Sequence, residues 1–146
     1  MTVRRLGALF AVLLLFACGA LAADEAALAR FAARAGLGDI EGFVAAVEAI
    51  DATGRLPARY LAKAQAEKLG WRPGQDLCKA APGKAIGGDR FSNRERHLPE
   101  KPGRQYREAD LDYACGARGA KRLVFSNDGL RFVTVDHYRS FLEVPR

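Results

Sequence analysis

The stretch RLVFSNDGLRFVTV (residues 122–135) carries the strongest structural signal in this sequence. Two runs rich in branched and aromatic side chains flank the turn Asn127-Asp128-Gly129. Short apolar runs joined by asparagine, aspartate and glycine are typical of a β-hairpin. The stretch therefore predicts two antiparallel strands, over Lys121–Ser126 and Leu130–Val135.

Turn residues and helical patterns divide the rest of the chain. Proline and glycine become frequent after Trp71, and the pattern there predicts further strands at Ala85–Phe91, Gln105–Asp110 and Phe141–Val144. Before Trp71, apolar residues recur at helical spacing over Asp39–Thr53, and a second short helix is predicted over Ala62–Leu69. Helices followed by strands predict an α+β fold, with N-terminal helices packed on a C-terminal antiparallel sheet.

Residues 1–22 have the pattern of a signal peptide. Two early arginines precede the apolar run Ala8–Ala17, and Ala20-Leu21-Ala22 matches a signal-peptidase site. We therefore expect a secreted protein, extracellular or periplasmic, without stable membrane association, because the apolar run is short for a membrane helix. A lipoprotein signal ending at Cys18 is the alternative, although Phe16 fits that pattern poorly.

Removing 22 of the 146 residues leaves 124, which suits a single domain. Residues 23–38 form an N-terminal extension, either a short helix or a disordered lead-in, and residues 39–146 form the main domain. The net charge of +6 falls to +4 when the leader is lost, which suits an anionic partner such as nucleic acid.

Two cysteines remain after cleavage, Cys78 and Cys115, and in an exported chain such a pair predicts a disulfide. Neither has another cysteine or a histidine at ligand spacing, so we expect no metal site. His97 and His137 are the only histidines. His97 lies in a basic stretch and is expected at the surface.

The chain from about Phe43 to Phe141 resembles the secreted, guanyl-preferring microbial ribonucleases of the barnase kind. The resemblance is carried by the runs LPARYLAKAQAEKLGW, APGKAIGGDRFSNRE, READ, RLVFS and DHY, which occur in family order. It implies that residues 39–146 are a ribonuclease domain. The implied activity is cleavage of single-stranded RNA 3′ to guanosine, through a 2′,3′-cyclic phosphate and without a metal or cofactor.

The resemblance also implies a role for each motif residue. Glu108 matches the general base and His137 the general acid, which are the two groups that this proton transfer requires. The matching phosphate-binding cations are Lys63, Arg118 and Arg122, and the supporting acids are Asp89 and Asp110. Base recognition falls to the loop Phe91, Ser92, Asn93, Arg94 and Glu95, with Tyr138 as a stacking face.

Several alternatives and departures accompany this resemblance. The chain could instead be a catalytically weak cationic RNA-binding module, or a toxin-like ribonuclease delivered to competitors. A cytoplasmic inhibitor protein of the barstar kind is an implied partner, and a monomer is expected. Ala117 and Gly119 replace bulkier family residues around Arg118, and the cysteines are additions. We expect their bridge to tie the guanine-side loops to the catalytic sheet.

Overall fold

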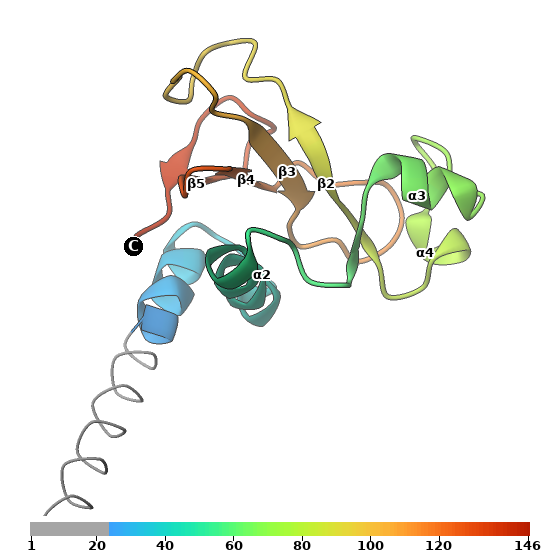
Figure 1. Cartoon of the computed structure of the whole chain (residues 1–146). Helices are drawn as coiled ribbons and strands as arrows, with labels where there is room; N and C mark the ends of the chain where they lie inside the picture. Colours follow the sequence, from blue (N-terminus) through green and yellow to red (C-terminus); the bar gives the residue numbers. More distant parts are fainter. Residues whose placement is uncertain (1–23) are drawn as a thin grey trace, which may run out of the picture.

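The computed structural model describes residues 24–146 (Figure 1), so the predicted leader and the alternative signal at Cys18 lie outside the described residues. A helix over residues 24–34 is followed by α2 (Ile40–Thr53). Asp39 caps α2 by accepting from the Gly42 N–H, and Gly54 ends it in the left-handed conformation. Both ends of α2 agree with the prediction.

Two short elements appear that the sequence pattern did not predict. These are β1 (Tyr60–Leu61) and α4 (Leu77–Ala80), which flank α3 (Lys63–Lys68). The two-residue β1 exists because it pairs in parallel with the next strand, and the four-residue α4 begins where the Asp76 side chain caps Cys78 N–H. Elements this short leave no periodic pattern to read.

The strands form one six-stranded sheet in the order β1-β2-β3-β4-β5-β6, antiparallel except for the β1 and β2 pair. The remaining strands are β2 (Ala85–Phe91), β3 (Tyr106–Asp110), β4 (Arg122–Ser126), β5 (Arg131–Thr134) and β6 (Leu142–Glu143). All five lie where strands were predicted, and none of their ends differs from the prediction by more than one residue. The fold class is confirmed as α+β.

The main core lies between one face of this sheet and the first two helices (Figure 1). Alternate residues of β3, β4 and β5 point into it, including Ala109, Leu123 and Val133. The N-terminal helix contributes Phe31, whose ring stacks on Phe43 of α2 at 5.9 Å. Residues 24–34, within the predicted N-terminal extension, are therefore helical and part of the core. Within residues 24–146, no helix has both the length and the apolar character needed to cross a bilayer.

Candidate active site

Glu108 lies in the middle of β3, on the sheet face opposite the main core. Its register partners are Asp89 on β2 and Val124 on β4. The pairing of β2 with β3 shifts at Gly88, which has a φ of 99° and forms an irregularity in the strand. This irregularity places Asp89 opposite Glu108. The sequence Gly87-Gly88-Asp89 thus shapes one side of the site.

Lys63 and Asp89 approach Glu108 from the neighbouring elements. The backbone N–H of Lys63, at the start of α3, donates to Oδ2 of Asp89 at 3.0 Å. Lys63 Nζ then lies 3.7 Å from Oε1 of Glu108, and its side chain stays 41% exposed. Asp89 therefore anchors the helix that carries the lysine, while the ammonium group remains accessible to an anion.

Asp110 holds the two predicted arginines side by side. Arg118 donates to both oxygens of Asp110 at 2.7 Å, which raises the pKa of Arg118. Arg122 Nε lies 3.1 Å from Asp110 Oδ1 as an ion pair, although its alignment does not make a hydrogen bond. Arg118 uses Nε and Nη2 to bind Asp110, and Arg122 uses Nη1 to bind the carbonyl oxygens of Gly119 and Lys121. These contacts leave Nη1 of Arg118 and Nη2 of Arg122 unused.

His137 lies in the turn over residues 135–141, here termed the catalytic turn. His137 and Tyr138 have positive φ angles of 57° and 69°. Such a conformation costs non-glycine residues on the order of 1–2 kcal/mol each, so neighbouring contacts must hold it. Tyr138 N–H donates to Thr134 Oγ1 at 3.0 Å, and Asp136 accepts from the Ser140 hydroxyl at 2.6 Å. The hydrogen bonds to Asp136, first that from Ser140, lower its pKa to about 2.

Tyr138 links this turn to Glu108. Its hydroxyl donates to Oε2 of Glu108 at 2.6 Å, its ring stacks on Phe91 at 5.3 Å, and the Arg122 guanidinium lies 5.9 Å from the ring centroid. Burial, and then the hydrogen bond to Glu108, raise the pKa of Tyr138 to about 12. The exposed His137 ring lies 4.9 Å from the Tyr138 ring. Tyr138 thus contacts the predicted base and lies beside the predicted acid.

The predicted base-reading residues lie in a loop over residues 91–98, here termed the recognition loop. Asn93 is buried and fastens the loop, because its side chain donates to Leu98 O at 2.9 Å and accepts from Leu98 N–H at 3.1 Å. Ser92, Arg94 and Glu95 stay exposed. The Asn93 side chain therefore stabilises the conformation of the loop, and the Glu95 side chain lies exposed on the loop surface.

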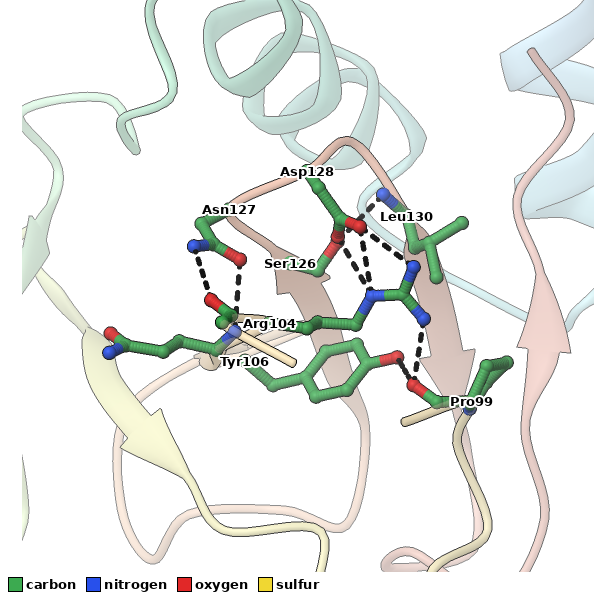
Figure 2. Close-up of polar contacts among 9 residues, drawn as sticks. Pro99, Arg104, Tyr106, Ser126, Asn127, Asp128 and Leu130 are labelled. Carbon is green, nitrogen blue, oxygen red and sulfur yellow. Dashed lines mark hydrogen bonds and ion pairs between the residues drawn. The ribbon is translucent and has the colours of Figure 1, made fainter. Parts of the chain in front are cut away.

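Arg104 anchors the chain that returns from the recognition loop (Figure 2). Its guanidinium donates to the Asp128 carboxylate at 2.7–3.0 Å and to Pro99 O at 2.9 Å. Tyr106 also donates to Pro99 O, at 2.6 Å. Asp128 belongs to the predicted hairpin turn, so this turn both joins β4 to β5 and supports the recognition loop.

The predicted disulfide is present, with Cα atoms of Cys78 and Cys115 5.4 Å apart. The expectation that it ties the guanine-side loops to the sheet was wrong. Cys78 belongs to α4, which packs with Trp71 in a separate cluster, and the bridge joins α4 to the loop carrying Arg118. Asp76 lies close to both sulfurs, but these are bonded to each other and offer no thiolate to a metal.

Glu108, Asp110 and Arg122 are buried on the sheet face opposite the main core, whereas the Lys63 side chain and His137 beside them are exposed to solvent. Neither of two cavities, of 780 and 480 Å³, includes Glu108 or His137 in its lining. The larger lies on the helix side of the sheet, and the smaller lies beside the recognition loop, at Phe91 and Ser92.

Sequence reasoning missed several supporting residues. Asp136 and the pair of Arg104 with Asp128 hold the segments around the predicted site in place. The sequence did point to Asn93, but for base recognition, whereas its side chain fastens the loop. Asp136 stands directly before the predicted acid in DHY, and an aspartate that begins a turn is a capping signal that could have identified it. The pair of Arg104 with Asp128 spans 24 residues and has no comparable local signal.

Comparison with known proteins shows the family of this chain. The family model for ribonuclease matches residues 45–145. A ribonuclease of Heyndrickxia coagulans is 52% identical over 91 residues, or 62% of this chain and 84% of that protein. Ribonucleases of Bacillus intermedius and Bacillus pumilus match at the same identity, and the chain spans 56% of each. A crystal structure of ribonuclease Sa2 with guanosine-2'-cyclophosphate is 28% identical, with a TM-score of 0.35, over 63% of this chain and 89% of that one. The family match and the 52% identity show that this chain belongs to the ribonuclease family.

Proposed function

We propose that this chain is an exported, metal-independent endoribonuclease that cleaves single-stranded RNA 3′ to guanosine through a 2′,3′-cyclic phosphate. Membership in the ribonuclease family implies the RNA substrate. One observation carries the proposal: Glu108, the turn that bears His137, and the cations Lys63, Arg118 and Arg122 lie together on one sheet face. An RNA-binding module would need only the cations.

Glu108 acts as the base of the first step. It takes the proton of the ribose 2′-hydroxyl, the 2′-oxygen attacks phosphorus, and His137 protonates the 5′-oxygen that leaves. Tyr138 must release Oε2 of Glu108 for this step, since it donates to that atom at 2.6 Å. That hydrogen bond supports the role of Glu108 as the base, because the Glu108 carboxylate already accepts a proton donor at this atom.

The cations stabilise the negative charge that develops on the phosphoryl oxygens. Asp110 uses one edge of the Arg118 guanidinium and braces Arg122, which leaves the Nη donors described above for the phosphate. Lys63 adds a positive charge 3.7 Å from Glu108. In the second step, the roles reverse, and His137 activates the water that opens the cyclic phosphate while Glu108 returns a proton.

Guanine recognition is assigned to the recognition loop. Its backbone N–H groups would donate to guanine O6, and the exposed Glu95 carboxylate would accept from N1–H and the N2 amine, a pattern that adenine lacks. The Phe91 and Tyr138 rings, stacked at 5.3 Å, supply the apolar surface beside it.

The proposal is tested by assaying the purified protein on GpU, ApU, CpU and UpU, with and without EDTA. We expect cleavage of GpU to be fastest, to pass through a cyclic phosphate and to be unaffected by EDTA. His137→Ala should lose both cleavage and cyclic-phosphate hydrolysis, and Glu108→Ala should lose cleavage, each by roughly two to four orders of magnitude.

The matched measurement is binding of a 2′-deoxy analogue, which cannot be cleaved. Both variants should retain it, because Lys63, Arg118 and Arg122 remain in place. A wild-type protein that binds the analogue but leaves every dinucleotide intact would identify the RNA-binding module instead. Loss of cleavage in EDTA would contradict the metal-independent mechanism.

Export and partners form the remaining part of the proposal. The leader pattern in residues 1–22 and the disulfide between Cys78 and Cys115 support an oxidising destination outside the cytoplasm. An active ribonuclease would endanger its own cell before export, so we include a cytoplasmic inhibitor protein. Fractionation of producing cells tests export. A plain secreted enzyme should appear in the medium of a pure culture, whereas a toxin-like enzyme should leave the cell only in contact with competitors. Light scattering of the purified protein tests the expected monomer.

A further inference from the structure

His97 connects the recognition loop to the catalytic turn. Its Nδ1 lies 3.3 Å from the carbonyl oxygen of Tyr138. A carbonyl oxygen can only accept, so Nδ1 carries the proton in this contact. Within residues 24–146, this is the one hydrogen bond between the two segments. The neutral tautomer with Nδ1–H and the imidazolium can both make it, so the contact does not require a particular charge.

The peptide unit that receives this hydrogen bond is held at both ends. The N–H of Arg139, in the same planar unit as the Tyr138 carbonyl, donates to Asp136 Oδ1 at 3.1 Å. Asp136 thus holds one end from inside the turn, and His97 holds the other from the recognition loop. Because Tyr138 has a positive φ, external contacts of this kind determine whether the conformation persists.

Aromatic contacts run parallel to the hydrogen bond. The His97 and Phe141 rings pack edge to face, with their centroids 6.3 Å apart and an angle of 70° between their planes. Phe91 contacts Phe141 at 6.0 Å and stacks on Tyr138 at 5.3 Å. Four rings therefore join the base of the recognition loop to the turn that presents the acid.

The recognition loop places His97 as a consequence of its own shape. Asn93 fastens the loop at Leu98, the residue after His97, and its carbonyl accepts from Arg96 N–H at 2.9 Å. A shift of the base-reading residues would therefore move His97, and a shift of His97 would change its contact with Tyr138.

We propose that His97 is a positioning residue that couples guanine recognition to the placement of the general acid. The inference rests on the proposed function and adds a communication between its two halves. When the recognition loop closes on guanine, His97 holds the Tyr138 peptide unit and so keeps His137 aimed at the leaving oxygen. With a base that does not bind the recognition loop, His137 would not be held in this alignment.

The test compares His97→Ala with His97→Asn, whose amide nitrogen takes the place of Nδ1. We expect His97→Ala to lower kcat on GpU by about three- to tenfold, the value of one hydrogen bond, and to leave ApU cleavage unchanged. KM for GpU should change little, because no contact with substrate is removed. His97→Asn should restore kcat, and the melting temperature of both variants should match the wild type, since His97 is exposed.

Glu100→Gln is the matched control, because Glu100 lies after the recognition loop and its side chain, 59% exposed, forms a 3.9 Å ion pair with Arg96. It should leave kcat on GpU unchanged. An equal loss on GpU and ApU in His97→Ala, no loss at all, or a loss that His97→Asn does not restore would overturn the coupling. A wild-type protein without cleavage activity would instead count against the proposed function.

Discussion

Glu95 is the side chain on which we expect the choice of base to depend. Its exposed carboxylate is the acceptor proposed for guanine N1–H and N2. Glu95→Ala should lower kcat/KM on GpU by roughly 10- to 100-fold, as for a lost hydrogen bond to a charged group, and should hardly affect ApU. The ratio of the two rates measures the effect.

Glu100→Ala is the control for this prediction. Glu100 is an exposed acid that follows the recognition loop, and its contact is a 3.9 Å ion pair with Arg96. It should keep the wild-type preference, because an exposed pair of this kind contributes little. A guanine preference that survives Glu95→Ala would place base selection elsewhere.

The disulfide joins two elements that the chain could otherwise separate. It closes a segment of 37 residues between α4 and the loop that carries Arg118. In the chain-entropy model, a loop of this length stabilises the folded state by about 4 kcal/mol. We expect the double variant Cys78→Ser with Cys115→Ser to lose free energy of unfolding of that order, measured by urea denaturation.

Activity should respond less than stability in this variant. Asp76 accepts hydrogen bonds from Gly116 N–H at 2.9 Å and from the Tyr113 hydroxyl at 3.2 Å. Together with the ion pair of Arg118 with Asp110, these bonds keep the loop attached when the disulfide is removed. The folded fraction should therefore retain cleavage in low urea. Reduction of the wild type should reproduce the loss of stability. An unfolding free energy equal to that of the wild type would contradict the prediction.

The protein as a whole should lose stability in acid. Among residues 24–146, four carboxylates have a lowered pKa. The hydrogen bond from Ser140 acts first on Asp136, that from Arg104 on Asp128, and that from Gly116 N–H on Asp76. Burial raises the pKa of Asp112, but the hydrogen bonds that it accepts, first that from Lys121, outweigh burial. A carboxylate with a lowered pKa in the folded state stabilises it above the ordinary value of 3.8, and the contribution is lost as the pH falls through the folded value, about 2 for Asp136. The free energy of unfolding should therefore fall from pH 4 toward pH 2.

Asp136→Asn provides the control for the acid prediction. It removes one titrating group, so the free energy of unfolding should depend less steeply on pH in that range. Urea denaturation of both proteins at several pH values measures the difference. Identical slopes would show that Asp136 has the same pKa in the folded and unfolded states.

Local patterns in the sequence were enough to predict the longer elements. The apolar periodicity of α2, its ends at Asp39 and Gly54, and the Asn127-Asp128-Gly129 turn all express preferences of a few neighbouring residues. The motifs that resemble the ribonucleases pointed to Glu108 and His137, and the family match confirms the resemblance. The individual roles of these residues stay predictions.

Contacts between distant residues explain what the patterns could not show. β1 exists only through its pairing with β2, and α4, which has no periodicity of its own, determines which parts of the fold the predicted bridge between Cys78 and Cys115 joins. Likewise, the hydrogen bonds of Tyr138 to Glu108, and of His97 to Tyr138, join residues 30 and 41 positions apart. The local sequence supplies the side chains for such contacts, but their distances and partners arise when the sheet brings the strands together, because packing and not local preference sets them.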